Sequence, residues 1–209
     1  MSDYSETIQH VDTATGIRLR LEHYVGPPSS PETVNTLLTE SVCLALDNVA
    51  AGESSNVAIS LHEDGSASVL EDSPGIRVDK HKELIESILT EVFACKKHKR
   101  DPLAKDVCQF GIVLTNALSE WFTYETAQDG WIWKIEFVRG LRQRPLEKTE
   151  PCTNTWRRIS FRPDRDIFAE VGLSSSVFRK WFCEQRLNLG SSTVTLVDRG
   201  QVETLHPQN

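Results

Sequence analysis

The stretch SVCLALDNVAAG, residues 41–52, combines apolar residues at helical spacing with a closing glycine. Val42, Ala45 and Val49 continue one apolar stripe, which is typical of a helix with one buried face. Leu44 and Asn48 lie on a neighbouring stripe of mixed character, one helical turn apart. A mixed stripe beside a core stripe is typical of a helix that lines a pocket, and also of an ordinary half-exposed helix.

The signals upstream place the start of this helix. Ser29 or Ser30 can cap it, Pro31 suits its first turn, and Glu32 adds a negative charge near its positive end. The predicted helix runs to about Ala51, and Gly52 ends it. Residues 1–30 are expected to have little regular structure. We expect residues 1–14 to form an N-terminal arm and residues 15–209 to form one domain.

The remaining pattern predicts an α+β fold. The first predicted elements are a hairpin at 56–72 around Asp64-Gly65, a turn at Ser73-Pro74-Gly75 and a helix at 79–94. A loop at 96–109 then leads to a buried helix over FGIVLTNALSEWF, which starts near Gly111. The last predicted elements are two strands joined at Asp129-Gly130, a strand in TWRRISFRPD, a helix at 174–188 and a closing strand in TVTLVDRG. This order indicates a mixed sheet covered by a layer of helices. Trp131, Trp133 and Phe137 lie on one face of a predicted strand. We interpret them as core residues or, alternatively, as a platform for an apolar ligand.

Composition excludes several classes of protein. The 209 residues are 39% hydrophobic and 25% charged, which is ordinary for a globular protein. The net charge of −7 argues against a general nucleic-acid binder. No apolar run is long enough to span a membrane and the acidic start is no signal peptide, so we expect a cytoplasmic protein. Five irregularly spaced cysteines and six histidines show no zinc-ligand spacing, so we expect reduced thiols and no metal site.

Six phrases in order carry a resemblance to a known family. They are GIRLRLEHYVG, SVCLALDNVAAG, VAISLHEDGSASVLEDSPGI, GIVLTNALS, ISFRPDRDIF and TVTLVDRG. Together they cover about residues 15–200 and resemble the N-terminal ATPase region of the DNA gyrase B subunit and topoisomerase IV, in the GHKL class. The resemblance implies a two-layer α/β sandwich of the GHKL type with a nucleotide cleft.

The family's first motif is altered here. It has a glutamate that activates water four residues before an asparagine that holds Mg²⁺. Asn48 is kept, but Leu44 stands at the glutamate position and cannot accept a proton. Glu40 lies one further turn back, about 6 Å along the helix axis.

The adenine and lid motifs are altered too. The adenine motif Asp-x-Gly-x-Gly reads here from Glu71 to Gly75, with Ser73 at a glycine position and Pro74 stiffening the turn. The glycines of the lid motif correspond to Asp106, Gln109 and Gly111, and lid glycines wrap phosphates with backbone N–H groups. Five of eight signature positions have changed, all against ATP binding or hydrolysis.

The resemblance, together with the altered motif positions of this sequence, predicts a stand-alone relative without ATPase activity. In one interpretation the cleft has partly filled in. In the other, it binds a non-nucleotide small molecule and catalyses a cyclisation or isomerisation in specialised metabolism. The candidate acid–base residues are Glu71, Asp72 and Glu40. The predicted ligand pocket comprises Leu44, Asp47, Asn48, Gly75, Ile76, Gln109 and Gly111.

An alternative function is a binding module that holds a nucleotide without hydrolysis, or that mimics the gyrase subunit to regulate or protect gyrase. A third hypothesis is slow ATP hydrolysis through Glu40. We expect no cofactor, and a metal at Asn48 only together with a Mg²⁺-nucleotide. The expected partner is a small molecule, with no nucleic acid and no membrane, and homodimerisation remains open.

Overall fold

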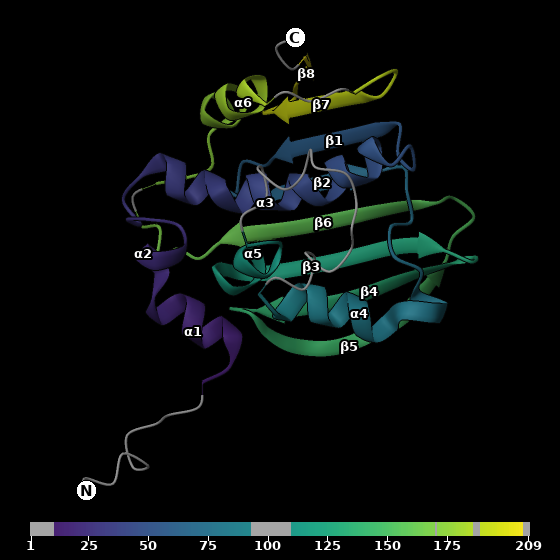
Figure 1. The fold of residues 1–209 in the computed structure, drawn as a ribbon, viewed down its shortest axis with the longest axis horizontal. Coiled ribbons are helices and arrows are strands. Elements are labelled where there is room, and N and C mark those ends of the chain that lie inside the picture. The colour runs from purple at the N-terminus through teal and green to yellow at the C-terminus, as the bar shows by residue number, and fades with distance from the viewer. Residues whose placement is uncertain (1–10, 93–109, 170, 186–188, 207–209) are drawn as a thin grey trace, which may run out of the picture.

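A computed structural model describes residues 11–92, 110–169, 171–185 and 189–206. Eight strands form one mixed sheet in the order β5-β4-β3-β6-β2-β1-β7-β8 (Figure 1). The strands are β1 (Asn56–Leu61), β2 (Ala67–Glu71), β3 (Ser119–Gln128), β4 (Trp131–Val138), β5 (Leu141–Pro151), β6 (Trp156–Pro163), β7 (Thr193–Asp198) and β8 (Gln201–Leu205). Strands β1 and β7 pair in parallel, and the other neighbouring pairs are antiparallel.

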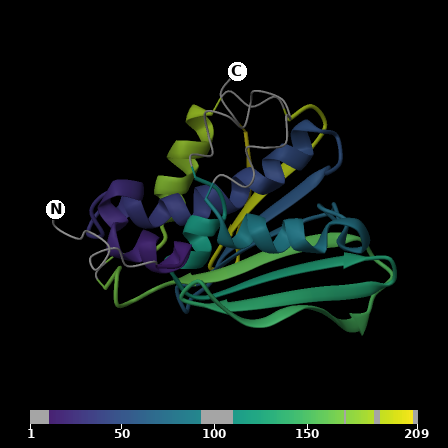
Figure 2. The same cartoon turned by 60° about the horizontal axis from the view of Figure 1, so that its bottom comes forward.

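The described helices cover one face of this sheet, as Figure 2 shows. They are α1 (Thr13–Leu19), α2 (Leu21–Tyr24), α3 (Pro31–Ala50), α4 (Val78–Thr90), α5 (Val113–Ala117) and α6 (Ser175–Glu184). The core lies between the two layers, because alternate strand residues such as Ile59, Val69 and Ile159 are buried beneath the helices. The prediction of an α+β fold with a mixed sheet under helices is confirmed.

Helix α3 follows its sequence signals closely. Ser30 caps it by accepting a hydrogen bond from the Glu32 N–H, and Ala51 ends it. Its predicted apolar stripe of Val42, Ala45 and Val49 is buried, and so is Leu38, one turn before Val42. The predicted hairpin at 56–72 is confirmed by strands β1 and β2.

The prediction of little regular structure in residues 1–30 is wrong for residues 13–24, which form α1 and α2. Ile17 is fully buried and Leu21 nearly so. Arg18 donates a hydrogen bond to the Ala117 carbonyl at 3.0 Å and pairs with the buried carboxylate of Asp164. These helices therefore belong to the core, since tertiary contacts supply the stability that such short helices lack alone. Of the arm predicted over residues 1–14, residues 1–10 lie outside the described residues, while Thr13 and Ala14 belong to α1.

The helix predicted over FGIVLTNALSEWF is wrong at its C-terminal end. Helix α5 stops at Ala117, and Ser119–Gln128 form β3 between β4 and β6. Aromatic and β-branched residues fill this segment, and pairing on both sides favours a strand over a helix. Helix α4 ends at Thr90, before the predicted end at residue 94, and the predicted loop at 96–109 lies outside the described residues.

Two strands carry no alternating signal in the sequence. Strand β5 is an edge strand in which only Leu146 is buried, so its sequence is dominated by exposed polar residues. Strand β8 is a short edge strand after the turn at Arg199-Gly200. On β4, Phe137 is buried and Trp133 packs partly against the core, whereas Trp131 is 37% exposed.

Candidate functional site

A cluster of buried polar side chains joins α3 to the centre of the sheet. Glu71 and Arg157 are register partners on neighbouring strands β2 and β6, and both point into the core, with 2% and 3% of their surface exposed. The Arg157 guanidinium forms an ion pair with the Glu71 carboxylate. From α3, Asn48 donates its amide N–H groups to both Glu71 oxygens at 3.1 Å. The asparagine of the first motif is thus bonded to the carboxylate of the adenine motif.

Arg157 makes two further contacts that hold it in place. Its Nη2 donates to the Leu44 carbonyl on α3 at 2.9 Å. Gly75 has a φ of +63°, and a Cβ built there would meet the guanidinium Nη1 at 2.9 Å. The arginine therefore fills the space between the helix, β2 and the Ser73–Gly75 turn, and Gly75 is needed both for its backbone conformation and for this close approach.

The turn after β2 is held from β3. The Thr126 hydroxyl donates to the Pro74 carbonyl at 2.8 Å. Gln128 accepts from the Val78 N–H at 2.9 Å and donates to the Ile76 carbonyl at 3.2 Å. The turn is therefore fixed against the sheet rather than left as an open loop.

The electrostatic effects on Glu71 oppose each other. Burial raises its pKa, while the charge of Arg157 and the hydrogen bonds from Asn48 lower it, and the net direction is upward. A free carboxylate with a raised pKa could act as an acid or base. Here the two oxygens already bind Asn48 and Arg157, so the described geometry engages Glu71 in internal contacts.

Asp72 turns away from this cluster. Its Oδ1 accepts hydrogen bonds from the Ser54 hydroxyl and from the backbone N–H groups of Ser55 and Asn56, and its Oδ2 accepts from the Asn56 amide. Partial burial raises the pKa of Asp72, but these bonds outweigh that effect and lower it to about 2. Asp72 is therefore ionised at neutral pH and anchors the start of β1.

Glu40 lies apart from Glu71, two helical turns before Asn48 on α3. Glu40 is 3% exposed, and its carboxylate accepts hydrogen bonds from the Gly111 N–H at 2.8 Å and the Phe110 N–H at 3.4 Å. It also borders a cavity of about 460 Å³ between α2, α3 and α6, with Tyr24 and Trp181 among its walls. Glu40 thus joins α3 to the chain that leads into α5.

The other predicted pocket residues take different positions. Leu44 and Ile76 are half-buried and pack against the core. Asp47 is half-buried on α3, and Gly111 is bonded to Glu40, while Gln109 lies outside the described residues. The structure therefore brings together Asn48, Glu71 and Gly75, with Leu44 contributing its carbonyl, and separates them from Asp72 and Glu40.

Arg157 is the residue that sequence reasoning missed. The strand TWRRISFRPD places Arg157 in phase with Ile159 and Phe161, which face the core. Glu71 holds the same inward phase on β2. Two opposite charges at inward positions of two strands are a readable signal of a buried ion pair, because charged residues are rarely buried unless paired.

Neither a membrane-spanning helix nor a metal-binding cluster occurs among the described residues. Within the ranges that the structure describes, no helix is long and apolar enough to cross a bilayer. In the same ranges, no group of three or more histidine, cysteine, aspartate or glutamate side chains is arranged to hold a metal ion.

The chain is similar in sequence to topoisomerase subunits. It is 29% identical over 182 residues to the B subunit of the type 2 topoisomerase of Aquifex aeolicus, covering 84% of this chain and 23% of that protein. It is 30% identical over 215 residues to the DNA gyrase B protein of Archaeoglobus fulgidus, covering 97% and 34%, and 30% identical over 178 residues to that of Thermotoga maritima, covering 82% and 28%. The chain thus spans about a quarter to a third of these relatives. No protein-family model matches it.

A solved structure agrees with these sequence matches. The 43K ATPase domain of Thermus thermophilus gyrase B, in complex with an aminocoumarin, superimposes with a TM-score of 0.74 and 25% identity. The match covers 99% of this chain and 54% of that one. The chain is therefore related to the B subunits of DNA gyrase and type 2 topoisomerase and has the fold of the gyrase B ATPase domain.

Proposed function

We propose that this chain is a gyrase-B-like domain without ATPase activity, and that its former nucleotide cleft holds a non-nucleotide small molecule. The observation that carries the proposal is the buried Glu71–Arg157 ion pair. The resemblance to the gyrase B family implies that the residue at the Glu71 position accepts a hydrogen bond from the amino group of adenine. In this chain a guanidinium of the protein itself donates to that carboxylate.

The residues present do not fit a Mg²⁺-nucleotide. Leu44 stands where the water-activating carboxylate is expected, and it cannot accept a proton. The Asn48 amide is directed to Glu71 and Ser73. Arg157 packs against Gly75, beside the carboxylate that would meet adenine. A nucleotide would have to displace a buried and hydrogen-bonded arginine, which is costly because Glu71 would lose its charge partner.

A small molecule with apolar surface fits these changes better. Leu44 and Ile76 are half-buried apolar side chains, and replacing a carboxylate by leucine makes the lining more apolar. The related gyrase B domain was solved with an aminocoumarin, so this fold accommodates a molecule of that kind. If the chain also catalyses a cyclisation or isomerisation, the engagement of Glu71 favours catalysis by shape and orientation over proton transfer from this residue.

Calorimetric titration tests both parts of the proposal. We expect no heat of binding with a non-hydrolysable ATP analogue and Mg²⁺, and saturable binding with an aminocoumarin. Ile76→Ser should weaken the aminocoumarin binding, whereas Val202→Ser, at a site that is 71% exposed on β8, should leave it unchanged. The Thermus thermophilus gyrase B domain serves as the positive control for the aminocoumarin.

The titrations with the ATP analogue and with the aminocoumarin test the two parts of the proposal separately. Micromolar binding of the ATP analogue would refute the loss of nucleotide binding. If the folded protein binds no aminocoumarin, this class of small molecule is excluded as its ligand, whatever the result with the ATP analogue.

A second candidate is a module that associates with or imitates gyrase. It is favoured by the preservation of the fold over 99% of the chain despite the altered site residues. This function predicts that the chain co-purifies with gyrase subunits and changes the supercoiling rate. Unchanged supercoiling at a molar excess of the protein would exclude it.

A further inference from the structure

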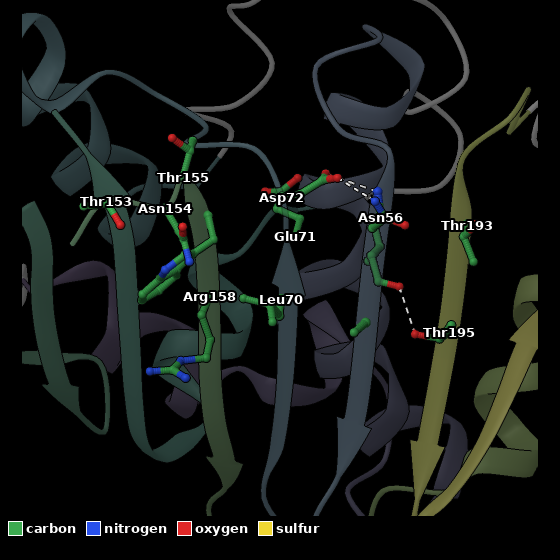
Figure 3. Close-up of a pocket in the computed structure, with 13 residues that line it drawn as sticks. Asn56, Leu70, Glu71, Asp72, Thr153, Asn154, Thr155, Arg158, Thr193 and Thr195 are labelled. Carbon is green, nitrogen blue, oxygen red and sulfur yellow. Dashed lines mark hydrogen bonds between the residues drawn. The ribbon is translucent and has the colours of Figure 1, made fainter. Parts of the chain in front are cut away.

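The face of the sheet opposite the helices carries a hollow of about 870 Å³. Its floor is a row of register partners across four strands: Arg158 on β6, Leu70 on β2, Ala58 on β1 and Thr195 on β7. Figure 3 shows the labelled side chains of this hollow spread across the four strands, with Thr153–Thr155 on one side and Thr193 on the other.

Several polar side chains in the hollow have no hydrogen-bond partner among the described residues. Some charged side chains on the same face are paired, as in Arg162 with Glu120 at 2.7 Å and Lys134 with Glu136 at 2.8 Å. In the hollow, four polar side chains make no hydrogen bond to another described residue, those of Thr153, Asn154, Thr155 and Thr193. Hydroxyl and amide groups on both rims are therefore available to a bound molecule.

Charge in the hollow argues against an anionic ligand. Arg158 is the cation among its lining residues, and it is already paired with Glu125 at 2.7 Å. Asp72 lies at one end of the hollow and is ionised at neutral pH. A phosphate or a nucleic-acid backbone would meet a carboxylate and, among the described lining residues, no unpaired cation, so a neutral ligand is favoured.

One aromatic ring supplies a flat apolar surface. Trp156 lines the hollow, and the Arg158 guanidinium carbon lies 5.2 Å from its ring centroid. The Arg158 guanidinium thus contacts both the Trp156 indole and the Glu125 carboxylate. An indole beside hydroxyl and amide groups suits a molecule with one apolar face and a rim of hydroxyl groups.

We propose that this hollow is a binding site for a neutral polyhydroxylated molecule of the saccharide class. Its C–H face would lie on Trp156, and its hydroxyl groups would bond to Asn154, Thr155 and Thr193 on the two rims. The site lies on the face of the sheet that the helices leave open. Glu71 is among its lining residues, but the side chains of Glu71 and Arg157 are buried on the opposite face of the sheet. It therefore stands independently of the function proposed above.

Saturation-transfer NMR and tryptophan fluorescence on the full chain test the site with cellotetraose and maltotetraose as probes. We expect saturable binding of at least one probe, weakened about tenfold by Trp156→Ala. Trp131→Ala is the matched control, because this tryptophan is 37% exposed and lies outside the hollow. Asn154→Ala and Thr155→Val, both at exposed rim positions, should also weaken binding and provide a test if Trp156→Ala fails to fold.

Three results would overturn the proposal. The first is the absence of binding by both probes to folded protein. The second is binding that Trp156→Ala, Asn154→Ala and Thr155→Val leave unchanged. The third is tighter binding of a sulfated oligosaccharide than of its neutral counterpart, because the hollow offers no unpaired cation among its described residues.

Discussion

Removing Arg157 should destabilise the fold strongly, and the loss should depend on pH. Arg157→Met keeps the apolar bulk of the side chain but leaves Glu71 as a buried charge that is bonded to Asn48 and exposes 2% of its surface. Breaking a buried pair in this way costs about 4 kcal/mol. For a domain of this size, that loss lowers Tm by about 8 to 16 °C.

The pH dependence follows from Glu71. Burial already raises the pKa of this carboxyl above its ordinary value, and the loss of Arg157 removes the charge that opposes this shift. A group with a raised folded-state pKa favours the folded state at low pH, and that contribution is lost as the pH rises through the folded-state pKa. The difference in Tm between Arg157→Met and the parent should therefore be larger at pH 8 than at pH 5.

A double variant isolates the ion pair from the packing. Glu71→Leu with Arg157→Met removes both charges, leaving the Leu44 carbonyl and the Asn48 amide short of one partner each. We expect the double variant to be about 2 kcal/mol more stable than Arg157→Met and to lose its added pH dependence. Urea unfolding at pH 5 and pH 8 measures both quantities. A loss below about 1 kcal/mol in Arg157→Met, or additive losses in the double variant, would refute the buried pair.

Two further predictions concern Asp72 and the contact of Gly140 with α1 and α5. Asp72→Asn should lower stability at pH 7 by about 1 kcal/mol, a value reduced for solvent screening. Because the pKa of Asp72 is lowered to about 2, the parent should lose this stabilising contribution as the pH falls from about 4 towards 2. The variant, which lacks the carboxylate, should show no such loss. Equal acid unfolding profiles of the two proteins in circular dichroism would contradict the anchoring role. Gly140→Ala should cost more than about 2 kcal/mol, on the order of an overpacked core site, since a Cβ there would collide with the side chain of Ala14 and meet the Ala117 Cα at 3.1 Å. Gly200→Ala, whose Cβ would meet open space at a similar φ of +80°, is its control, and equal losses in thermal unfolding would show that backbone strain alone is responsible.

Much of the fold could be predicted because the relevant signals are local. Ser30 caps α3 and Gly52 follows its C-cap residue Ala51, and the alternation on either side of Asp64-Gly65 marks the first hairpin. The order of the six phrases indicated the family, and the relationship to gyrase B is confirmed. Edge strand β5 escaped prediction because an exposed strand has no buried phase to read, apart from Leu146.

The chemistry of the site depended on which residues meet across the fold. The sequence by itself determined that Leu44 cannot serve as a base and that Asn48 lies one turn further on the same helix face. It presented Glu71, Asp72 and Glu40 as three candidate carboxylates. Only the tertiary structure separates them: Glu71 faces the core and meets Arg157 on a strand far along the chain, whereas Asp72, the next residue, points to the opposite side. Side chains of neighbouring strand residues alternate between faces, and partners distant in sequence come together only when the strands pair, so the environment of each carboxylate is a property of the folded sheet.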